Sequence, residues 1–260
     1  MGSVHATIDA GVLTLTLENG AINSMSLAMA RELDRKVERA AADDGIGAVV
    51  VTGSGSRAFC AGSDIGELRS MHERGAGPAE LLQAENSAFD RLAALDIPTV
   101  AAVNGVAVGG GVELAVCCDI VVAARNATFS LPEIRLGVFP GIGGTVRIPR
   151  RVGFGRAMEL MLTGREISAE EAHRIGLVDR LVAGDAVLDE AAKLAARFAA
   201  GPRRAQAALK QAMRVSAELP EREALERVLR MALEHGDSAE VGEGLRAFLA
   251  KEKPDFKKLR

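Results

Sequence analysis

The alternation of apolar and polar residues near the start of the chain predicts two β-strands. They are Val4–Ile8 and Val12–Leu17, the second of which alternates only in part. A β-branched run, Ile46–Thr52, ends at a glycine, which is typical of a strand buried on both faces. Two further apolar runs, Thr99–Val103 and Ile120–Ala124, also predict strands. The first half of the chain therefore contains short strands separated by longer segments.

Helical spacing of apolar residues appears between these strands. Ser26 can cap a helix whose apolar positions include Ala30, Leu33 and Val37. A second helix is expected after Pro78, because proline suits the first helical turn. The order of strand and helix predicts an α/β core with crossover connections.

The second half of the chain is mainly helical. From about Gly153 onward, only Leu177–Val182 predicts a strand. The expected helices are Arg156–Leu162, Ala169–Ile175, Asp185–Ala199, Pro202–Ser216, Pro220–His235 and Ser238–Ala250. We divide the chain into a core, residues 1–195, and a C-terminal helical region, residues 196–260. Long amphipathic helices without strands to cover favour an oligomer, although an internal helical layer explains them equally well.

Composition and charge exclude several classes of protein. The chain is 48% hydrophobic and 26% charged, as in an ordinary globular protein. A net charge of −3, with no Trp or Tyr and only 8 Phe, argues against nucleic-acid binding. Glycine accounts for 28 of the 260 residues, a larger fraction than the average usage of about 7%.

The cysteines and histidines suggest neither disulfides nor a metal site. Two of the three cysteines, Cys117 and Cys118, are adjacent, and the four histidines lack zinc-ligand spacing. The N-terminal residues do not combine a charged segment with an apolar run, so no export signal is indicated. We expect a reducing, cytoplasmic environment.

One apolar stretch has the length of a membrane span. The 22 residues between Asp96 and Asp119 contain a single charge, Glu113. However, Pro98 and the Gly109–Gly111 triplet divide this stretch into a short strand, a turn and the start of a helix. We interpret it as a buried core segment and expect no membrane association.

Two glutamates are candidates for acid–base chemistry. Glu113 lies among apolar residues, where an ionised carboxylate needs a partner or a raised pKa. Glu133 follows Pro132 and precedes a glycine-rich stretch, Gly137–Thr145, that suits a cavity wall. Taken alone, Glu113 also fits a half-exposed helix position and Glu133 a helix cap. Together, two carboxylates beside a cavity suit general acid–base catalysis.

Backbone N–H groups are the second candidate feature. Gly109–Gly111 opens a helix, where unpaired N–H groups and the helix dipole favour negative charge. Ala61–Asp64 is another turn that leads into a helix. Two such N–H groups that converge would form an oxyanion hole for a polarised carbonyl, whereas separately each is a tight turn.

A dinucleotide-binding motif is the main competing pattern. Gly53–Ala58 follows a predicted strand and matches G-x-G-x-x-A. A Rossmann unit then requires a helix, a second strand and an acidic residue about 20 positions on. Here the chain continues into a polar segment without a second strand, which disfavours an NAD(P)-dependent oxidoreductase.

The combination of these motifs resembles the enoyl-CoA hydratase/isomerase (crotonase) superfamily over nearly the whole chain. The order of the motifs and the 20-residue spacing from Glu113 to Glu133 make the resemblance specific. The segments that carry it are Ala58–Ile65, Pro98–Asp119, Leu131–Thr145, Thr163–Val178 and Phe248–Phe256. The resemblance implies a spiral of ββα repeats with C-terminal helices that form trimers, often paired as hexamers.

The resemblance also implies a reaction and its residues. The substrate would be a coenzyme A thioester, a trans-2-enoyl-CoA, hydrated to the 3-hydroxyacyl-CoA without metal or redox cofactor. Glu113 and Glu133 would act on one water, and the backbone N–H groups of Ser63 and Gly110 would hold the thioester oxygen.

Residues for coenzyme A binding follow from the same pattern. Ala61, Asp64 and Ile65 would contact the coenzyme, and the backbone of Gly141 would line the pocket. Many hydratases carry a lysine where this chain has Gly66. A basic tail either supplies this charge instead, from the same or a neighbouring subunit, or is a solvated terminus. It comprises Lys251, Lys253, Lys257, Lys258 and Arg260.

Other functions remain open at this stage. A Δ3–Δ2 enoyl-CoA isomerase would need only the glutamate at position 133. Other enzymes of the superfamily share the fold. A non-catalytic oligomeric or RNA-binding homologue would be expected to lack both glutamates, and this chain retains both.

Overall fold

The strands form two sheets. A computed structural model describes residues 2–75 and 77–259, and in it one sheet has the strand order β1-β2-β3-β5-β7-β10 and the other β4-β6-β8-β9. The larger sheet contains β1 (Ser3–Asp9), β2 (Val12–Glu18), β3 (Ala48–Gly53), β5 (Thr99–Val103), β7 (Ile120–Ala124) and β10 (Arg180–Val182). The smaller sheet contains β4 (Ala58–Cys60), β6 (Val106–Val108), β8 (Thr128–Ser130) and β9 (Glu166–Ser168).

The chain alternates between the two sheets. In the larger sheet β1 and β2 are antiparallel, and the remaining neighbours run parallel. In the smaller sheet β4, β6 and β8 are parallel, and β9 runs antiparallel to β8. Each of β3, β5 and β7 is followed directly by a strand of the smaller sheet and then by helical structure. The predicted spiral of ββα turns is confirmed.

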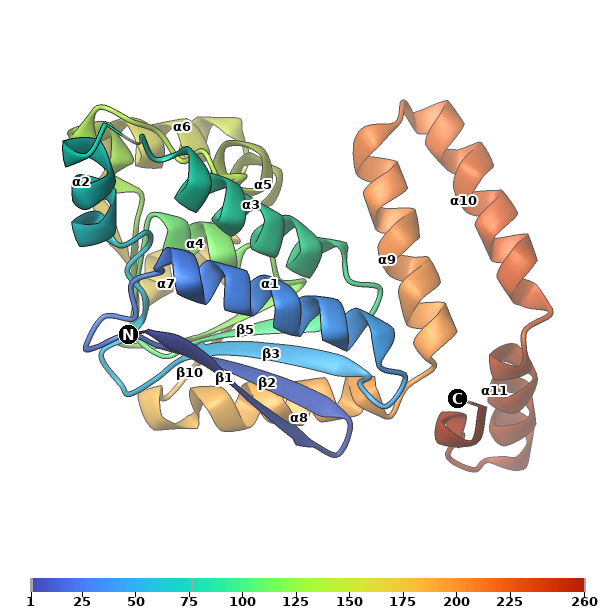
Figure 1. The fold of residues 1–260 in the computed structure, drawn as a ribbon. Coiled ribbons are helices and arrows are strands. Elements are labelled where there is room, and N and C mark those ends of the chain that lie inside the picture. Colours follow the sequence, from blue (N-terminus) through green and yellow to red (C-terminus); the bar gives the residue numbers. More distant parts are fainter. Residues whose placement is uncertain (1, 76, 260) are drawn as a thin grey trace.

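Helices cover both faces of the larger sheet (Figure 1). Helices α1 and α3 pack together on one face, and α8 packs on β3 and β5 from the other. The α-helices of the core are α1 (Leu27–Ala42), α2 (Ile65–Glu73), α3 (Ala79–Ala94), α4 (Gly110–Ala115), α5 (Gly144–Val152), α6 (Phe154–Thr163), α7 (Ala169–Arg174) and α8 (Val187–Ala199). The C-terminal helices are α9 (Arg203–Glu218), α10 (Glu221–Gly236) and α11 (Ala239–Ala250). Short 3₁₀ helices are η1 (Pro132–Leu136), η2 (Gly184–Ala186) and η3 (Phe256–Leu259).

A buried asparagine joins the two sheets. Asn104, between β5 and β6, donates from Nδ2 to the carbonyl oxygens of Gly53 at 2.9 Å and Gly55 at 2.7 Å. Its Oδ1 also accepts from the Gly53 N–H at 3.3 Å. These bonds satisfy backbone groups that would otherwise be buried without partners. They hold the turn after β3 against the turn after β5, where the chain passes from one sheet to the other.

The shortest elements differ from the sequence prediction. The predicted strands of the larger sheet and the Ser26 cap are confirmed, since the Ser26 hydroxyl accepts from Met29 N. The strands β4, β6, β8 and β9 were not identified, and the prediction of a single strand after Gly153 was wrong because β9 precedes β10. Three residues are too few to show an alternation. Helix α5 was also missed, because three glycines shortly precede it, its first residue is Gly144 and Pro149 lies within it.

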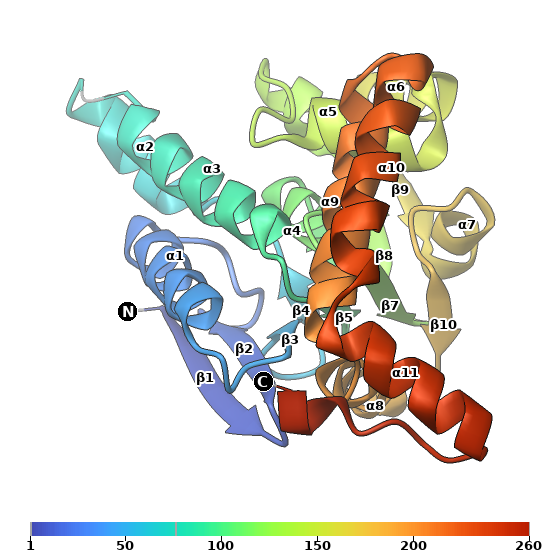
Figure 2. The same ribbon diagram turned by 90° about the vertical axis from the view of Figure 1, so that its right-hand side faces the viewer.

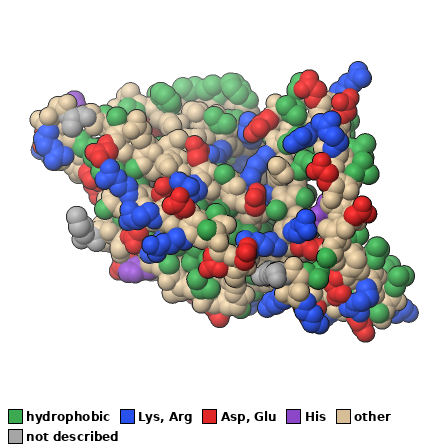
Figure 3. All heavy atoms as spheres, turned by 45° about the vertical axis from the view of Figure 1, so that its right-hand side comes forward, with side chains coloured by type: hydrophobic (Ala, Val, Ile, Leu, Met, Phe, Trp, Pro, Cys, Tyr) green, Lys and Arg blue, Asp and Glu red, His purple; other side chains and the backbone are tan. Residues whose placement is uncertain are grey.

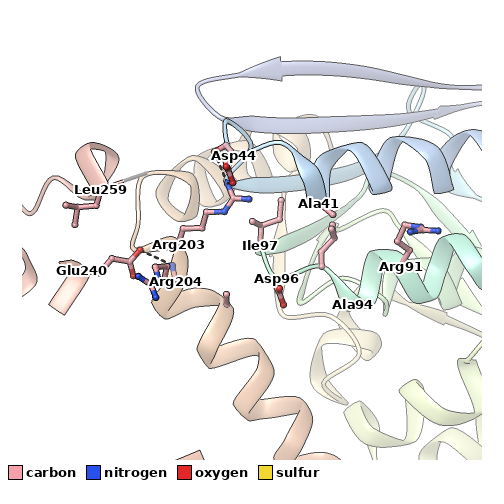
Figure 4. Close-up of a pocket in the computed structure, with 12 residues that line it drawn as sticks. Ala41, Asp44, Arg91, Ala94, Asp96, Ile97, Arg203, Arg204, Glu240 and Leu259 are labelled. Carbon is pink, nitrogen blue, oxygen red and sulfur yellow. Dashed lines mark hydrogen bonds and ion pairs between the residues drawn. The ribbon is translucent and has the colours of Figure 1, made fainter. Parts of the chain in front are cut away.

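The C-terminal helices lie apart from the core (Figure 1). Polar contacts attach α9 to the core: Lys210 Nζ donates to Ile97 O at 2.9 Å, and Arg214 Nη2 donates to Leu95 O at 2.7 Å. A cavity of about 460 Å³ lies between α1, α3 and the C-terminal region (Figure 4). There Arg203 Nη1 donates to Asp44 O at 2.7 Å. The boundary at residue 195 between the core and the C-terminal region stays a prediction. Helix α8 spans this boundary and packs on the larger sheet.

The outer helices expose apolar side chains. Figure 3 shows hydrophobic groups along them, and Phe248 and Leu249 of α11 are each 80% exposed. On α10, Leu225, Leu229 and Leu233 recur every four residues and are 60–67% exposed. In the described part of the chain, no helix is both long and apolar enough to cross a bilayer.

Packing of α4 against β4 generates a test of the fold. A Cβ atom at Gly111 would lie 1.9 Å from Cys60 O, so we expect Gly111→Ala to lower the free energy of unfolding by about 1–3 kcal/mol or more. Gly242 in α11 has open space, and Gly242→Ala is expected to change it by less than about 1 kcal/mol. Urea unfolding measures both. Equal effects of the two substitutions would contradict the packing described here.

Candidate active site

Glu113 lies in the first turn of α4, a helix whose residues are all buried. The side chain is 2% exposed, and its Oε1 accepts the backbone N–H groups of Ile142 and Gly144, each at 2.8 Å. A Cβ at Gly144 would lie 2.7 Å from Oε1, so glycine permits this approach. The partner expected for the buried carboxylate is therefore the backbone of the glycine-rich loop.

The pKa of Glu113 reflects opposing influences. Burial raises the pKa above its ordinary value, because a desolvated carboxylate is less stable than the neutral acid. The N–H groups of Gly144 and Ile142 and the positive charge of Arg147 on α5 lower the pKa again. The net shift of the Glu113 pKa is upward, and these donors limit the rise that burial causes.

Glu133 lies in η1, directly after Pro132, as expected for the first turn of a helix. Both carboxyl oxygens are buried and have no hydrogen-bond partner among the described residues, so the side chain is not a helix cap. A Cβ at Gly109 would lie 3.0 Å from Glu133 Oε1, which places this carboxyl against the start of α4. Burial, with a smaller contribution from Glu113, raises the pKa of Glu133 to about 7, although its own backbone N–H opposes the shift.

The two predicted N–H donors lie side by side. A Cβ at Gly110 would lie 3.6 Å from Ser63 N, and a Cβ at Gly62 would lie 3.0 Å from Gly110 N. Gly110 is the first residue of α4, where an N–H has no partner within the helix. Around Ser63, Met25 N donates to Gly62 O and Asp64 N donates to Met25 O, so this bridge does not use the Ser63 N–H. The structure thus brings Ser63, Gly110, Glu113 and Glu133 to one end of α4.

The predicted coenzyme-binding residues divide into two groups. Ala61 and Asp64 flank the Ser63 turn, and the Asp64 side chain caps α2 by accepting Glu67 N at 3.0 Å. Ile65 begins α2 and is 58% exposed, and Gly141 precedes the residue that donates to Glu113. Lys251 is the C-cap residue of α11. Helix α11 lies far from α2 in Figures 1 and 2. Arg260 lies outside the described residues.

Glu85 was not predicted from the sequence. This residue of α3 is fully buried, and its Oε2 accepts the Ser63 hydroxyl at 2.8 Å. Its position was accessible from the sequence, because Leu81, Ala88 and Leu92 place it on the buried face of the helix at helical spacing. Its proximity to Ser63 was not accessible, since it depends on how α3 packs.

The segment with the dinucleotide-like motif has a different structure from a Rossmann turn. Gly53 ends β3 and Ala58 begins β4, so the glycines join two strands and do not open a helix. A pyrophosphate group bound at such a motif requires the N-terminus of a helix. The oxidoreductase alternative therefore lacks its structural basis.

Comparison with known proteins identifies the family. Residues 7–259 match the enoyl-CoA hydratase/isomerase family. The chain belongs to this family. A probable enoyl-CoA hydratase from Rhizobium meliloti is 40% identical over 247 residues, which cover 95% of this chain and 94% of the relative. The 2,3-dehydroadipyl-CoA hydratase of Escherichia coli is also 40% identical, with 95% of each chain covered.

Solved structures agree with this assignment. An enoyl-CoA hydratase from Bacillus anthracis superposes with a TM-score of 0.94 at 32% sequence identity, covering 98% of this chain and 99% of the other. The family predicted from the motifs and the crotonase-like fold are confirmed. The predicted hydratase class, a hydro-lyase, agrees with the names of these relatives.

The raised pKa of Glu133 predicts a pH-dependent stability. The folded protein retains the Glu133 proton up to about pH 7, whereas an unfolded chain releases it near 4.5. The folded state binds more protons between these values, so its stability decreases as pH rises through this range. We expect Glu133→Gln to gain roughly 1–2 kcal/mol relative to wild type between pH 4.5 and 8, after allowance for partial solvent screening.

Urea unfolding at several pH values measures this gain. Glu38→Gln on α1 is the control, because the Glu38 side chain is 62% exposed. It should follow the wild-type pH dependence. A constant difference between Glu133→Gln and wild type over this pH range would refute the assignment.

Proposed function

We propose that this enzyme adds water across the 2,3 double bond of a trans-2-enoyl-CoA and forms the 3-hydroxyacyl-CoA. The observation that carries the proposal is the meeting of two glutamates with buried carboxyl groups, from different elements, beside two adjacent backbone N–H groups. The names of the relatives support the same reaction class.

Glu113 would activate the water. Both backbone donors bind Oε1, so Oε2 is the oxygen available to a water molecule. The ionised carboxylate takes a proton from this water while the oxygen attacks C3. The N–H groups of Ile142 and Gly144 stabilise the ionised form that this step requires.

Glu133 would supply the second proton. Its pKa of about 7 leaves a substantial neutral fraction near neutral pH, and the neutral carboxyl donates a proton to C2. After one turnover Glu113 carries a proton and Glu133 is ionised. Transfer of the proton back, through exchange with water, restores the starting state.

The thioester oxygen would accept hydrogen bonds from the N–H groups of Ser63 and Gly110. Negative charge develops on this oxygen as C3 is attacked, and preorganised donors stabilise it. The close approach of Gly62 to Gly110 allows both donors to reach one oxygen atom.

Coenzyme A would bind along the Ser63 turn. Ala61, Asp64 and Ile65 would contact it mainly through backbone and apolar groups, with Gly141 on the opposite wall. Since Lys251 is remote from this end of its own chain, it would reach the coenzyme of a neighbouring subunit. The reaction needs only water and the thioester, so we propose no cofactor.

The oligomer and the cellular location are part of the proposal. The exposed apolar faces of the C-terminal helices support a homotrimer, with or without pairing into a hexamer. All three cysteines are free and buried, which is compatible with a reducing cytoplasm.

A Δ3–Δ2 enoyl-CoA isomerase is the second candidate, because one glutamate at position 133 suffices for proton transfer between two carbons. The hydrogen bonds to Glu113 favour the hydratase, since an isomerase has no need of a second carboxylate held in place.

Substitution of each glutamate tests the mechanism. We expect Glu113→Gln and Glu133→Gln each to lower kcat for crotonyl-CoA hydration by at least roughly 100-fold, the usual size of an acid–base contribution. Loss of absorbance of the conjugated thioester measures the rate, and Glu38→Gln serves as the surface control. Full activity in either variant would exclude the two-carboxylate mechanism. Retained turnover of a 3-enoyl-CoA in Glu113→Gln would favour the isomerase.

The oligomer is tested on α10. We expect the native protein to have three or six times the monomer mass of 27.2 kDa in sedimentation velocity. Changing Leu229 and Leu233 together to Asp introduces charge on the exposed apolar face and should shift the mass toward the monomer. A monomeric native protein would contradict the proposal.

A further inference from the structure

A third buried carboxyl group adjoins the proposed oxyanion hole. Glu85 has no exposed surface, and its Oε2 accepts the Ser63 hydroxyl at 2.8 Å. Its Oε1 is buried and has no partner. Among the described residues, the buried side-chain oxygens without a partner belong only to Glu85 and Glu133. The orphaned oxygens therefore cluster at one site.

Within the described part of the chain, no positively charged group compensates Glu85. The charged groups that act on it are two further carboxylates, Glu113 on α4 and Glu67 on α2. The Cys60 thiol of β4 is also within its electrostatic range, and it adds no positive charge. An ionised Glu85 would therefore be unfavourable among its neighbours.

Three arginines on or beside α3 form ion pairs with carboxylates other than Glu85. Arg31 of α1 pairs with Glu80 at 2.6 Å. Arg91 pairs with Asp34 of α1 at 2.7 Å. Arg147 of α5 pairs with Asp90 at 2.5 Å. Glu85 is left with a hydroxyl group as its only hydrogen-bond donor among the described residues.

These surroundings keep Glu85 neutral at physiological pH. Burial raises the pKa of Glu85 to about 8, and the repulsion by Glu113 and Glu67 adds to this effect. The Ser63 hydrogen bond opposes the shift only in part.

We propose that Glu85 is a positioning residue of the oxyanion hole that acts only as a neutral acid. In this form it holds the Ser63 side chain, and its ionisation places a negative charge beside the oxygen on which the enolate charge develops. The inference rests on the proposed function, because it concerns stabilisation of the same thioester oxygen.

Two sets of contacts hold the Ser63 turn. Gly62 adopts a φ of +80°, a conformation that glycine visits easily but does not hold rigidly. The backbone bridge to Met25 fixes the turn on one side. The side-chain bond from Ser63 to α3 fixes it on the other, so that the N–H group points in a constant direction. Stabilisation of an oxyanion depends on donors that are oriented before the reaction.

The pH dependence of kcat/KM for crotonyl-CoA tests the proposal. In wild type, ionisation of Glu133 should lower kcat/KM about tenfold per pH unit above pH 7, and that of Glu85 should increase the loss to about a hundredfold per unit above pH 8. Glu85→Gln cannot ionise but can still accept the Ser63 hydroxyl, so its loss should stay near tenfold per unit. The same steep loss in Glu85→Gln would overturn the proposal.

Two further variants separate positioning from packing. Glu85→Leu fills the space without accepting the Ser63 hydrogen, and we expect kcat to fall about 10-fold or more at pH 7 with a smaller change in KM. Glu85→Gln should restore most of this loss. Ser63→Ala keeps the backbone N–H but removes a hydrogen bond that lowers the pKa of Glu85. In this variant the steep loss of kcat/KM should therefore begin at a higher pH than in wild type. Equal losses in Glu85→Gln and Glu85→Leu, or an unmoved limb in Ser63→Ala, would contradict a positioning role.

A measurement without substrate provides an independent check. The folded state retains the Glu85 proton up to about pH 8 and the unfolded chain only to about 4.5, so wild type loses stability between these values relative to Glu85→Gln. The absence of any pH-dependent difference in urea unfolding would show that Glu85 is not the neutral acid inferred here. If wild type does not hydrate crotonyl-CoA at all, both the proposed function and this inference fail. Turnover with an unchanged pH profile in Glu85→Gln refutes the inference alone.

Discussion

The two backbone hydrogen bonds to Glu113 are the interaction on which the rest of the site depends. They join the first turn of α4 to the loop before α5, although these segments are far apart in the sequence. The contact is possible because Gly144 has no side chain where Oε1 lies. It fixes the loop containing Gly141 and keeps the carboxylate in a position from which a water can be held.

Burial of three carboxyl groups around one end of α4 lowers the stability of the folded protein, because each group loses its hydration. Each of Glu85, Glu113 and Glu133 has a raised pKa, and burial is the main cause in every case. Their hydrogen bonding differs, and this separates their states. Glu113 receives two N–H donors, Glu85 receives one hydroxyl, and Glu133 lacks a partner among the described residues. In the proposed mechanism this difference makes Glu113 the base and leaves Glu85 and Glu133 as neutral acids.

Elements with a strong local sequence pattern were predicted correctly, and elements with a weak pattern were not. Long apolar runs such as Ile46–Thr52 predicted the strands of the larger sheet, because burial on both faces leaves a continuous pattern. The smaller sheet left no such pattern, since β4 and β6 have three residues each. The motif order identified Glu113 and Glu133, but their state of protonation could not be predicted, because it depends on donors supplied by other segments.

The sequence by itself determined the family, the α/β architecture and the identity of the two candidate catalytic glutamates. These depend on motifs whose order can be read directly along the chain. Only the tertiary structure decided which groups meet. The packing of α3 brought Glu85 to Ser63, and the close contact of Gly62 with Gly110 brought two N–H groups near each other. The physical reason is that burial and electrostatic interaction act across space and are not encoded in the spacing along the chain.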